Sequence, residues 1–200
     1  MVHVTLADIC DVSSGFTARA RLEEASDGDL VLQMRDITDA PKVDASGLMR
    51  SVFEGAVGRY MVGAGDVVFR SKGERSVAAY LDKDFQSPAV AVLPVMILRM
   101  KAAVMPEYLV WAINQPEAQR HFGGDARSGT IRAVPKASIE SLPIDLPDLA
   151  TQQKIVEIDR LLRKEVELSS KLLLLRQQVV TEKLKLVAKG APHRDVKERQ

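Results

Sequence analysis

The side chains that could carry covalent or metal chemistry are few in this sequence and are poorly spaced for it. The single cysteine, Cys10, rules out an internal disulfide and an intrachain cysteine cluster for a metal, and it fits a reducing compartment. The three histidines, His3, His121 and His193, lie far apart and include no helical pair at metal-ligand spacing. We therefore expect a small buried thiol at Cys10 and no metal site.

The glycine-rich and acidic segments also lack the partners that catalysis needs. Gly63-Ala64-Gly65 has no third glycine and no helix after it, so it is typical of a turn and not of a dinucleotide-binding loop. Asp82-Lys83-Asp84 is typical of a charged turn. The sequence has no Gly-x-x-x-x-Gly-Lys loop, no Gly-x-Ser-x-Gly elbow and no Asn/Asp-Pro-Pro-Tyr box of amino-methyltransferases. We expect no active site in this chain.

The elements that must position any binding residues predict a mixed α/β domain over residues 1–147. Alternating apolar residues predict a strand over Asp29–Ile37. Apolar runs around a basic turn predict a hairpin of Val67–Phe69 and Val77–Leu81. The remaining predicted elements are a short element at Val4–Val12 before a turn at Gly15, a strand pair or one bent strand at Ala89–Leu98, a helix from Pro106 through Ala112, a second short helix from Pro116 to Phe122, a long turn from Gly123 to Thr130, a short extended segment at Ile131–Val134, a helical turn at Lys136–Glu140 and a closing strand at Leu142–Leu146.

One long helix follows this domain. It begins after Pro147, with Asp148 or Thr151 as its cap, and extends to Ala188 before Gly190. Its apolar residues alternate in steps of three and four, which is the seam of a coiled coil, and a helix this long leaves its seam in water unless another helix pairs with it. A second copy of the chain could supply that helix. The seam, and hence the expected dimerisation surface, consists of Ile158, Leu161, Leu168, Leu172, Leu175, Val179 and Leu186.

Charge is unevenly distributed along a chain whose net charge is only +1. Residues 1–58 carry five basic and ten acidic side chains, whereas residues 59–136 carry eleven and seven, and residues 148–200 carry twelve and eight. This is not the strongly basic chain of a non-specific nucleic-acid binder. If the chain binds DNA, the middle third carries the contact. The most apolar run, Ala89–Met100, is too short for a bilayer span, and we expect a cytoplasmic protein.

An ordered set of short motifs resembles the DNA-specificity subunit of type I restriction–modification systems. Leu6–Gly15 resembles the opening strand and glycine turn of that family, and Gly65–Phe69 resembles its glycine-aspartate hairpin. Ile139–Leu149, followed by Gln152–Val156, resembles its entry into a spacer helix, although Asp148 replaces a proline and a glutamate is missing before the glutamine. The other motifs are Gln33–Ile37, Met105–Leu109, Asn114, Gly123-Gly124 and Ser128–Ile131.

The resemblance implies a half-length subunit, because the family usually carries two recognition domains and two spacer helices. On this interpretation residues 1–147 form one target recognition domain, residues 148–189 form one spacer and dimerisation helix, and residues 190–200 form a disordered tail. Two copies with antiparallel helices would rebuild the two-domain shape. The homodimer would then read a bipartite, symmetric DNA site.

The resemblance also implies that DNA contacts come from loops and strand ends on one face of the domain. Arginine suits that role because its planar fork bonds guanine edges and phosphates in a bidentate manner. Replacing Arg70 and Arg75 by alanine is expected to weaken DNA binding with little change in melting temperature. The first-rank candidates are Arg70, Lys72, Arg75, Arg127, Ser128, Thr130 and Arg132, and the second-rank candidates, which have acidic neighbours, are Arg19, Arg21 and Arg35.

The implied role is recognition within an enzyme complex and not catalysis. The partners would be double-stranded DNA, a methyltransferase subunit and possibly a restriction subunit, which would dock at Leu172–Leu175 and hold all S-adenosylmethionine and ATP/Mg chemistry. The chain itself is expected to hold no cofactor and to contact no membrane. An alternative is an interaction, assembly or decoy module that has lost DNA reading, which the balance of 16 basic to 19 acidic residues in 1–147 slightly favours. A third, weaker alternative is a small nuclease with an unrecognised site.

Overall fold

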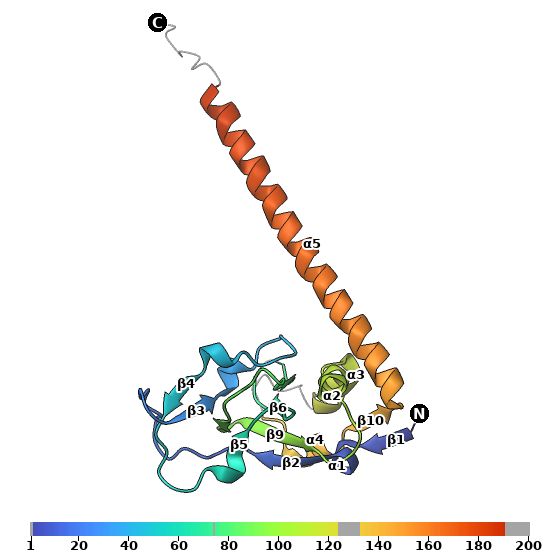
Figure 1. Cartoon of the computed structure of the whole chain (residues 1–200). Helices are drawn as coiled ribbons and strands as arrows, with labels where there is room; N and C mark the ends of the chain where they lie inside the picture. The colour runs from blue at the N-terminus through green and yellow to red at the C-terminus, as the bar shows by residue number, and fades with distance from the viewer. Residues whose placement is uncertain (1, 74, 124–132, 191–200) are drawn as a thin grey trace, which may run out of the picture. The chain divides into compact units, whose positions relative to one another are not determined.

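The computed structural model describes residues 2–73, 75–123 and 133–190 (Figure 1). By its internal contacts the chain divides into two units, Met1–Val156 and Glu157–Gln200. The first unit contains ten strands in the described residues, arranged in three small sheets, together with four short α-helices. The fold class expected from the sequence, a mixed α/β domain followed by one long helix, is confirmed.

The smallest sheet ties the beginning of the chain to the segment that precedes the long helix. Strand β1 (Val2–Thr5) runs antiparallel to β10 (Pro143–Leu146), and Val2 lies opposite Leu146. Helix α1 (Leu6–Ile9) follows β1 at once, with its first backbone N–H bonded to the carbonyl of Leu142 at 2.8 Å. The N-terminal strand is therefore held by both backbone pairing and a helix start.

The central sheet is antiparallel and is buried on both faces. Its order is β2-β9-β6-β7, formed by Cys10–Ser14, Val95–Met100, Val67–Arg70 and Val77–Tyr80. Because side chains alternate along a strand, Phe69 packs into one apolar cluster with Leu98 and Leu109, whereas Val68 packs into another with Ile97 and Leu32. The predicted hairpin is confirmed. Its first strand ends at Arg70, one residue later than predicted, and its second strand ends at Tyr80, one residue earlier than predicted.

A third sheet carries the opposite side of the second core. Its order is β4-β3-β8-β5, formed by Met49–Ser51, Asp29–Leu32, Ala89–Ala91 and Met61–Val62. The pairing of β3 with β8 is parallel, and the other two pairings are antiparallel. Three 3-10 turns punctuate this region, namely η1 (Met34–Asp36), η2 (Ala45–Gly47) and η3 (Gly58–Tyr60).

Two predicted strands differ from the structure. The strand expected over Asp29–Ile37 ends at Leu32, because the Asp36 carboxylate accepts the backbone N–H of Gln33 at 2.7 Å and turns the chain into η1. Of the two alternatives for Ala89–Leu98, the strand pair is correct, but β8 and β9 belong to different sheets. The short element expected at Val4–Val12 is resolved into parts of β1, α1 and β2.

The helices agree closely with the proline signals in the sequence. Helices α2 (Pro106–Ile113) and α3 (Pro116–Phe122) both begin with proline in the first turn, and α4 spans Lys136–Glu140. Helix α5 extends from Leu149 to Gly190, and the Asp148 carboxylate caps it by accepting the N–H of Thr151 at 2.7 Å. Among the described helices none is long and apolar enough to cross a membrane.

Candidate functional site

The β6–β7 hairpin presents the first group of candidate binding residues. Arg70, at the end of β6, is half-buried, and its guanidinium donates to the carbonyl of Ile37 at 3.0 Å and to that of Arg75 at 3.2 Å. Lys72 and Arg75 are exposed. Gly73 lies between them with φ +139°, which L side chains rarely adopt. Arg70 thus holds the hairpin tip in shape, and Lys72 and Arg75 offer their charges to solvent.

The return strand of this hairpin is anchored by the end of α2. Strand β7 is at the edge of its sheet, and the side chain of Asn114 bonds both the N–H and the carbonyl of Ala78, each at 2.9 Å. This amide satisfies backbone groups that an edge strand would otherwise leave open. Arg75 donates to the carbonyl of the same Asn114 at 3.4 Å. The hairpin tip is therefore fixed from two sides.

The second candidate group, Arg127, Ser128, Thr130 and Arg132, lies outside the described residues. The described segments on either side of this group both contact β6 or the turn after it. Before it, the ring of Phe122 lies 5.2 Å from that of Phe69. After it, Val134 donates its N–H to the carbonyl of Ser71 at 2.7 Å. The described segments before and after this group therefore both lie beside the hairpin.

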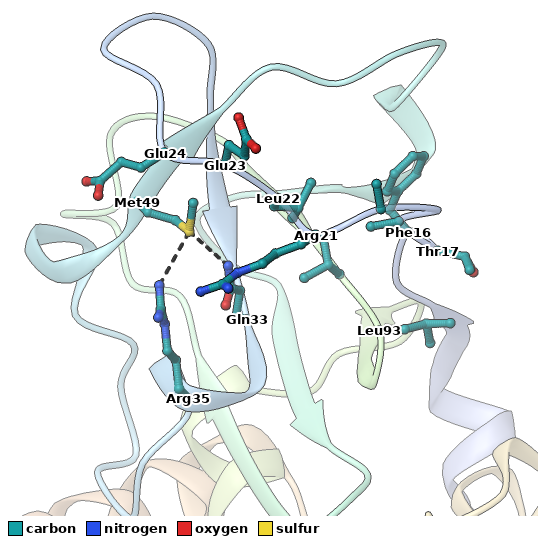
Figure 2. A pocket seen from close by; sticks show the side chains of 13 residues that line it. Phe16, Thr17, Arg21, Leu22, Glu23, Glu24, Gln33, Arg35, Met49 and Leu93 are labelled. Carbon is teal, nitrogen blue, oxygen red and sulfur yellow. Dashed lines mark hydrogen bonds between the residues drawn. The ribbon is translucent and has the colours of Figure 1, made fainter.

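A cleft of about 790 Å³ opens next to this hairpin, and it contains two of the second-rank arginines. Its walls are the loop after Phe16, the η1 turn and strand β4. Arg21 and Arg35 line it together with Gln33 and Met49 (Figure 2). Arg19 does not line this cleft but a neighbouring one of about 860 Å³ that the same loop also borders.

The loop that forms the cleft wall starts with a close backbone approach. A Cβ on Gly15 would lie 2.7 Å from the carbonyl oxygen of Ala91, so only glycine fits there. Phe16 then donates its N–H to that same carbonyl at 2.7 Å and packs edge-on against Phe53 and Tyr60, with 5.3 Å between ring centroids in each pair. The loop therefore leaves the sheet at a fixed point.

Two of the acidic neighbours that placed Arg21 and Arg35 in the second rank, Glu23 and Glu24, line the same cleft, and the one ion pair of Arg35 is with Asp36 at 3.8 Å. Figure 2 shows the carboxylates of Glu23 and Glu24 turned away from Gln33 and Arg35. Gln33 is a residue that reasoning from the sequence did not single out. Its one signal is local, a polar side chain directly after the buried pair Val31 and Leu32.

Two side chains that could act as nucleophile or base, Cys10 and His121, are buried or hydrogen-bonded. Burial raises the pKa of the Cys10 thiol to about 12, so it stays neutral near pH 7, and the predicted buried thiol is confirmed. His121 bonds the carbonyl of Ser138 at 2.9 Å through Nε2. Across the described residues no group of three His, Cys, Asp or Glu side chains could hold a metal ion. The hairpin tip and the neighbouring cleft offer a ligand charged side chains and hydrogen-bond donors.

The root of α5 is locked onto the first unit by one buried amide. Gln152 is 1% exposed; its Oε1 accepts the N–H of Met105 at 2.9 Å, and its Nε2 donates to the carbonyl of Pro147 at 2.9 Å. The carbonyl of Ala103 lies 3.4 Å from the same nitrogen. These hydrogen bonds give partners to the backbone N–H just before α2 and to the backbone carbonyl of Pro147, just before α5.

The seam residues of α5 are exposed to solvent in the described part of the chain. Each of the seven large apolar residues expected there is at least 49% exposed. Charged residues between them pair along the helix, as Arg160 does with Glu157 and Arg163 with Asp159, both at 2.7 Å. The side chains that stay uncovered are Ile158, Leu161, Leu168, Leu172, Leu175, Val179 and Leu186.

Comparisons with known proteins all point in one direction. A family model described as type I restriction modification DNA specificity domain matches residues 1–173. The type I restriction enzyme HindI specificity subunit of Haemophilus influenzae is 30% identical over 95 residues, which are 46% of this chain and 21% of that protein.

Solved structures share the fold. A type I R-M system whose assembly and conformational transition were studied has a TM-score of 0.62 at 18% identity, covering 93% of this chain and 43% of that one. The HsdS subunit from Thermoanaerobacter tengcongensis has a TM-score of 0.61 at 16% identity, covering 83% and 38%. The present chain thus spans less than half the length of these relatives.

Proposed function

The chain belongs to the family of type I restriction–modification DNA specificity domains, and from that premise we propose that it recognises a DNA sequence and has no catalytic activity of its own. The observation that carries this proposal is the family match, which runs through the whole first unit and into α5. The charged hairpin tip supports it, because Lys72 and Arg75 are exposed cations on one anchored turn. Backbone phosphates attract such cations.

We further propose that the functional unit is a homodimer formed through α5. The support is the exposed apolar seam of α5, because a helix of this length leaves such a seam in water unless another helix pairs with it. Antiparallel pairing of two α5 helices would bury the seam of both. A two-fold dimer of this kind has two recognition domains related by symmetry, so its DNA target would be two inverted half-sites with a gap.

The proposed DNA-binding residues are those that the resemblance implied. Lys72 and Arg75 are the exposed members of the described group, and Arg70 contributes by holding the tip through Ile37. The group beyond the described residues stays a prediction, supported by the bond between Val134 and Ser71. That group comprises Arg127, Ser128, Thr130 and Arg132.

The proposed partners follow from the family. A methyltransferase subunit, and a restriction subunit where one exists, would supply the S-adenosylmethionine and ATP/Mg chemistry in the cytoplasm. The run Leu172–Leu175 is apolar around more than one side of α5, and all four leucines are at least 49% exposed. A single helix-helix seam covers only one side of a helix, so this run has surface left for such a subunit.

DNA recognition is tested by selection from randomised duplexes with the purified chain. We expect one inverted-repeat motif to be enriched, and we expect affinity for it to fall linearly on a logarithmic salt scale, because phosphate contacts release counterions. A library without enrichment, or binding that does not depend on salt, would contradict DNA recognition. It would favour the interaction or decoy module, which the slightly acidic balance of residues 1–147 supports.

Dimerisation is tested by light scattering on a sizing column. Leu168→Lys with Leu175→Lys places two charges in the seam, and we expect this pair to convert a dimer into a monomer. Ser170→Lys with Gln177→Lys is the matched control, since these exposed residues lie on the opposite side of the helix and should leave the dimer intact. A monomeric parent protein would mean that the seam belongs to a different partner.

A further inference from the structure

Two hydrogen-bond donors in the cleft beside the hairpin converge on one poor acceptor. Gln33 Nε2 lies 3.0 Å from the sulfur of Met49, and Arg35 Nη2 lies 3.4 Å from the same sulfur (Figure 2). A thioether accepts hydrogen bonds only weakly. An amide and a guanidinium thus point at one spot in a concave surface without a strong acceptor between them.

The cleft around the Met49 sulfur contains charged side chains of both signs, and the two arginines, Arg21 and Arg35, supply donors to it. Arg35 has one acidic contact, a 3.8 Å approach of its Nε to Oδ1 of Asp36, whose other oxygen accepts the Gln33 N–H, and this pair leaves the Nη2 donor of Arg35 directed at the Met49 sulfur. Arg21 lines the same cleft and makes no hydrogen bond or ion pair to the described part of the chain. A ligand with acceptor atoms, partly negative in character, is the chemistry that fits these donors.

Two hydrogen bonds connect the hairpin that we propose to contact phosphates to residues close in sequence to the cleft lining. The guanidinium of Arg70 holds the carbonyl of Ile37, two residues beyond Arg35. On the other side, the hydroxyl of Ser71 donates to the carbonyl of Pro94 at 2.7 Å, next to the cleft residue Leu93. The cleft and the hairpin are therefore neighbouring features of the first unit.

Resting on the proposed DNA recognition, we propose that Gln33 and Arg35 are specificity-determining residues that read purine edges in the major groove. Gln33 would pair with N6 and N7 of an adenine, and Arg35 with O6 and N7 of a guanine, because these base edges match the two side chains in donor and acceptor pattern. Both donors exchange the Met49 sulfur for a stronger acceptor when the base arrives. Phe16, Leu22 and Leu93 line the cleft behind them and limit competing water.

A phosphate in the same cleft is the competing interpretation, and it predicts different behaviour. Phosphate contacts weaken or strengthen binding to all sequences alike, whereas base contacts change which sequence is preferred. Gln33 separates the two, since a neutral amide adds little to phosphate attraction but much to base discrimination.

The test is selection from randomised duplexes by the full chain and by three variants. Gln33→Glu keeps the size of the side chain but turns its donor into an acceptor, so we expect adenine at one position of each half-site to fall roughly tenfold in enrichment, with a gain for cytosine. Arg35→Ala, on an exposed side chain, is expected to relax a guanine preference by a similar factor. Lys83→Ala, which removes an exposed cation outside the cleft, should leave the motif unchanged.

The outcomes separate this inference from the proposal on which it rests. A wild-type motif that changes at single positions in the Gln33 and Arg35 variants, at unchanged melting temperature, supports base reading. A wild-type motif that both variants retain, with uniformly weaker binding in Arg35→Ala, overturns base reading in favour of a phosphate contact and leaves DNA recognition standing. A wild-type chain that enriches no motif overturns both.

Discussion

Leucine side chains are buried in the core of the first unit but exposed on the long helix α5. Leu98 and Leu109 in the first unit are 0% exposed, whereas Leu172 and Leu175 on α5 are each 49% exposed. Both regions carry a clear apolar pattern, a continuous apolar run in β9, which contains Leu98, and apolar residues every third or fourth position in α5. An apolar pattern therefore identifies the type of secondary structure, but it does not show which part of the molecule, or which partner, buries the apolar side chains. The first unit buries its core leucines within one chain, whereas the leucines of α5 stay exposed in the described part of the chain, which is why we propose a partner for that helix.

The largest expected effect on the free energy of unfolding comes from comparing a substitution at a buried leucine with one at an exposed leucine. Leu98→Ala removes a buried side chain between two packed layers, and we expect it to lower the free energy of unfolding by about 2–5 kcal/mol, independent of protein concentration. Leu172→Ala should have a smaller effect that grows as the protein is diluted, because it weakens the pairing of two chains. Urea titrations at two protein concentrations measure both. A concentration-independent loss at Leu172 would mean that the helix is covered by its own chain.

The next effect concerns the place where the two regions meet in sequence. Gln152→Ala leaves the Met105 N–H and the Pro147 carbonyl without their partner, and we expect a loss of about 1–3 kcal/mol in the free energy of unfolding. Gln153→Ala is the matched control, because its neighbouring amide is exposed. Equal losses in the two variants would show that the buried amide does not anchor the helix root.

A third experiment asks which region carries the DNA contact. Lys72→Ala with Arg75→Ala should weaken DNA binding and reduce the salt slope by about one for each phosphate that the variant no longer neutralises, with little change in melting temperature. Arg70 is left intact here because its bonds to Ile37 and Arg75 are structural. Lys171→Ala with Arg176→Ala removes the same charge from α5. If the helix pair reduced affinity as much as the hairpin pair, DNA binding would not be confined to the domain.

The smallest effect tests the helix start itself. The Thr151 backbone N–H lowers the pKa of the Asp148 carboxyl below its ordinary value of 3.8, so the cap stabilises the fold above that pH and is lost as the pH falls through the lowered value. Asp148→Ala should therefore lower the melting temperature slightly at pH 7 and less so in acid. Asp148→Asn, which can still cap, should retain most of the melting temperature. The same shift at both pH values would argue against a charge-dependent cap.

The elements marked by local chemistry were predictable from the sequence. Pro106 and Pro116 fixed two helix starts, the basic turn between two apolar runs fixed the hairpin, and Pro147 with Asp148 fixed the entry to α5. Each of these signals acts within a few residues. Helix and strand ends there agree with the structure to within one or two residues.

Features that depend on distant partners were not predictable. The strand after Asp29 stops early because of a carboxylate cap at Asp36, and the parallel pairing of β3 with β8 joins segments almost sixty residues apart in the chain. The cleft was missed for the same reason, since Gln33 becomes notable only through Met49, which is sixteen residues away. The hairpin itself was predicted because a basic turn between two apolar runs is visible locally, and its role in DNA binding stays a prediction.

The pairing of β1 with β10 also bears on the ends of the helix pair that we propose. Val2 lies opposite Leu146, so the start of the chain sits beside the entry to α5, which begins at Leu149. In the antiparallel dimer that we propose, the far end of one helix runs back toward the root of its partner, and hence toward the partner's first strand. The β1–β10 sheet of each domain would then lie near the last turns of the partner's α5, so the two ends of the paired helices would each meet a small sheet of the other chain.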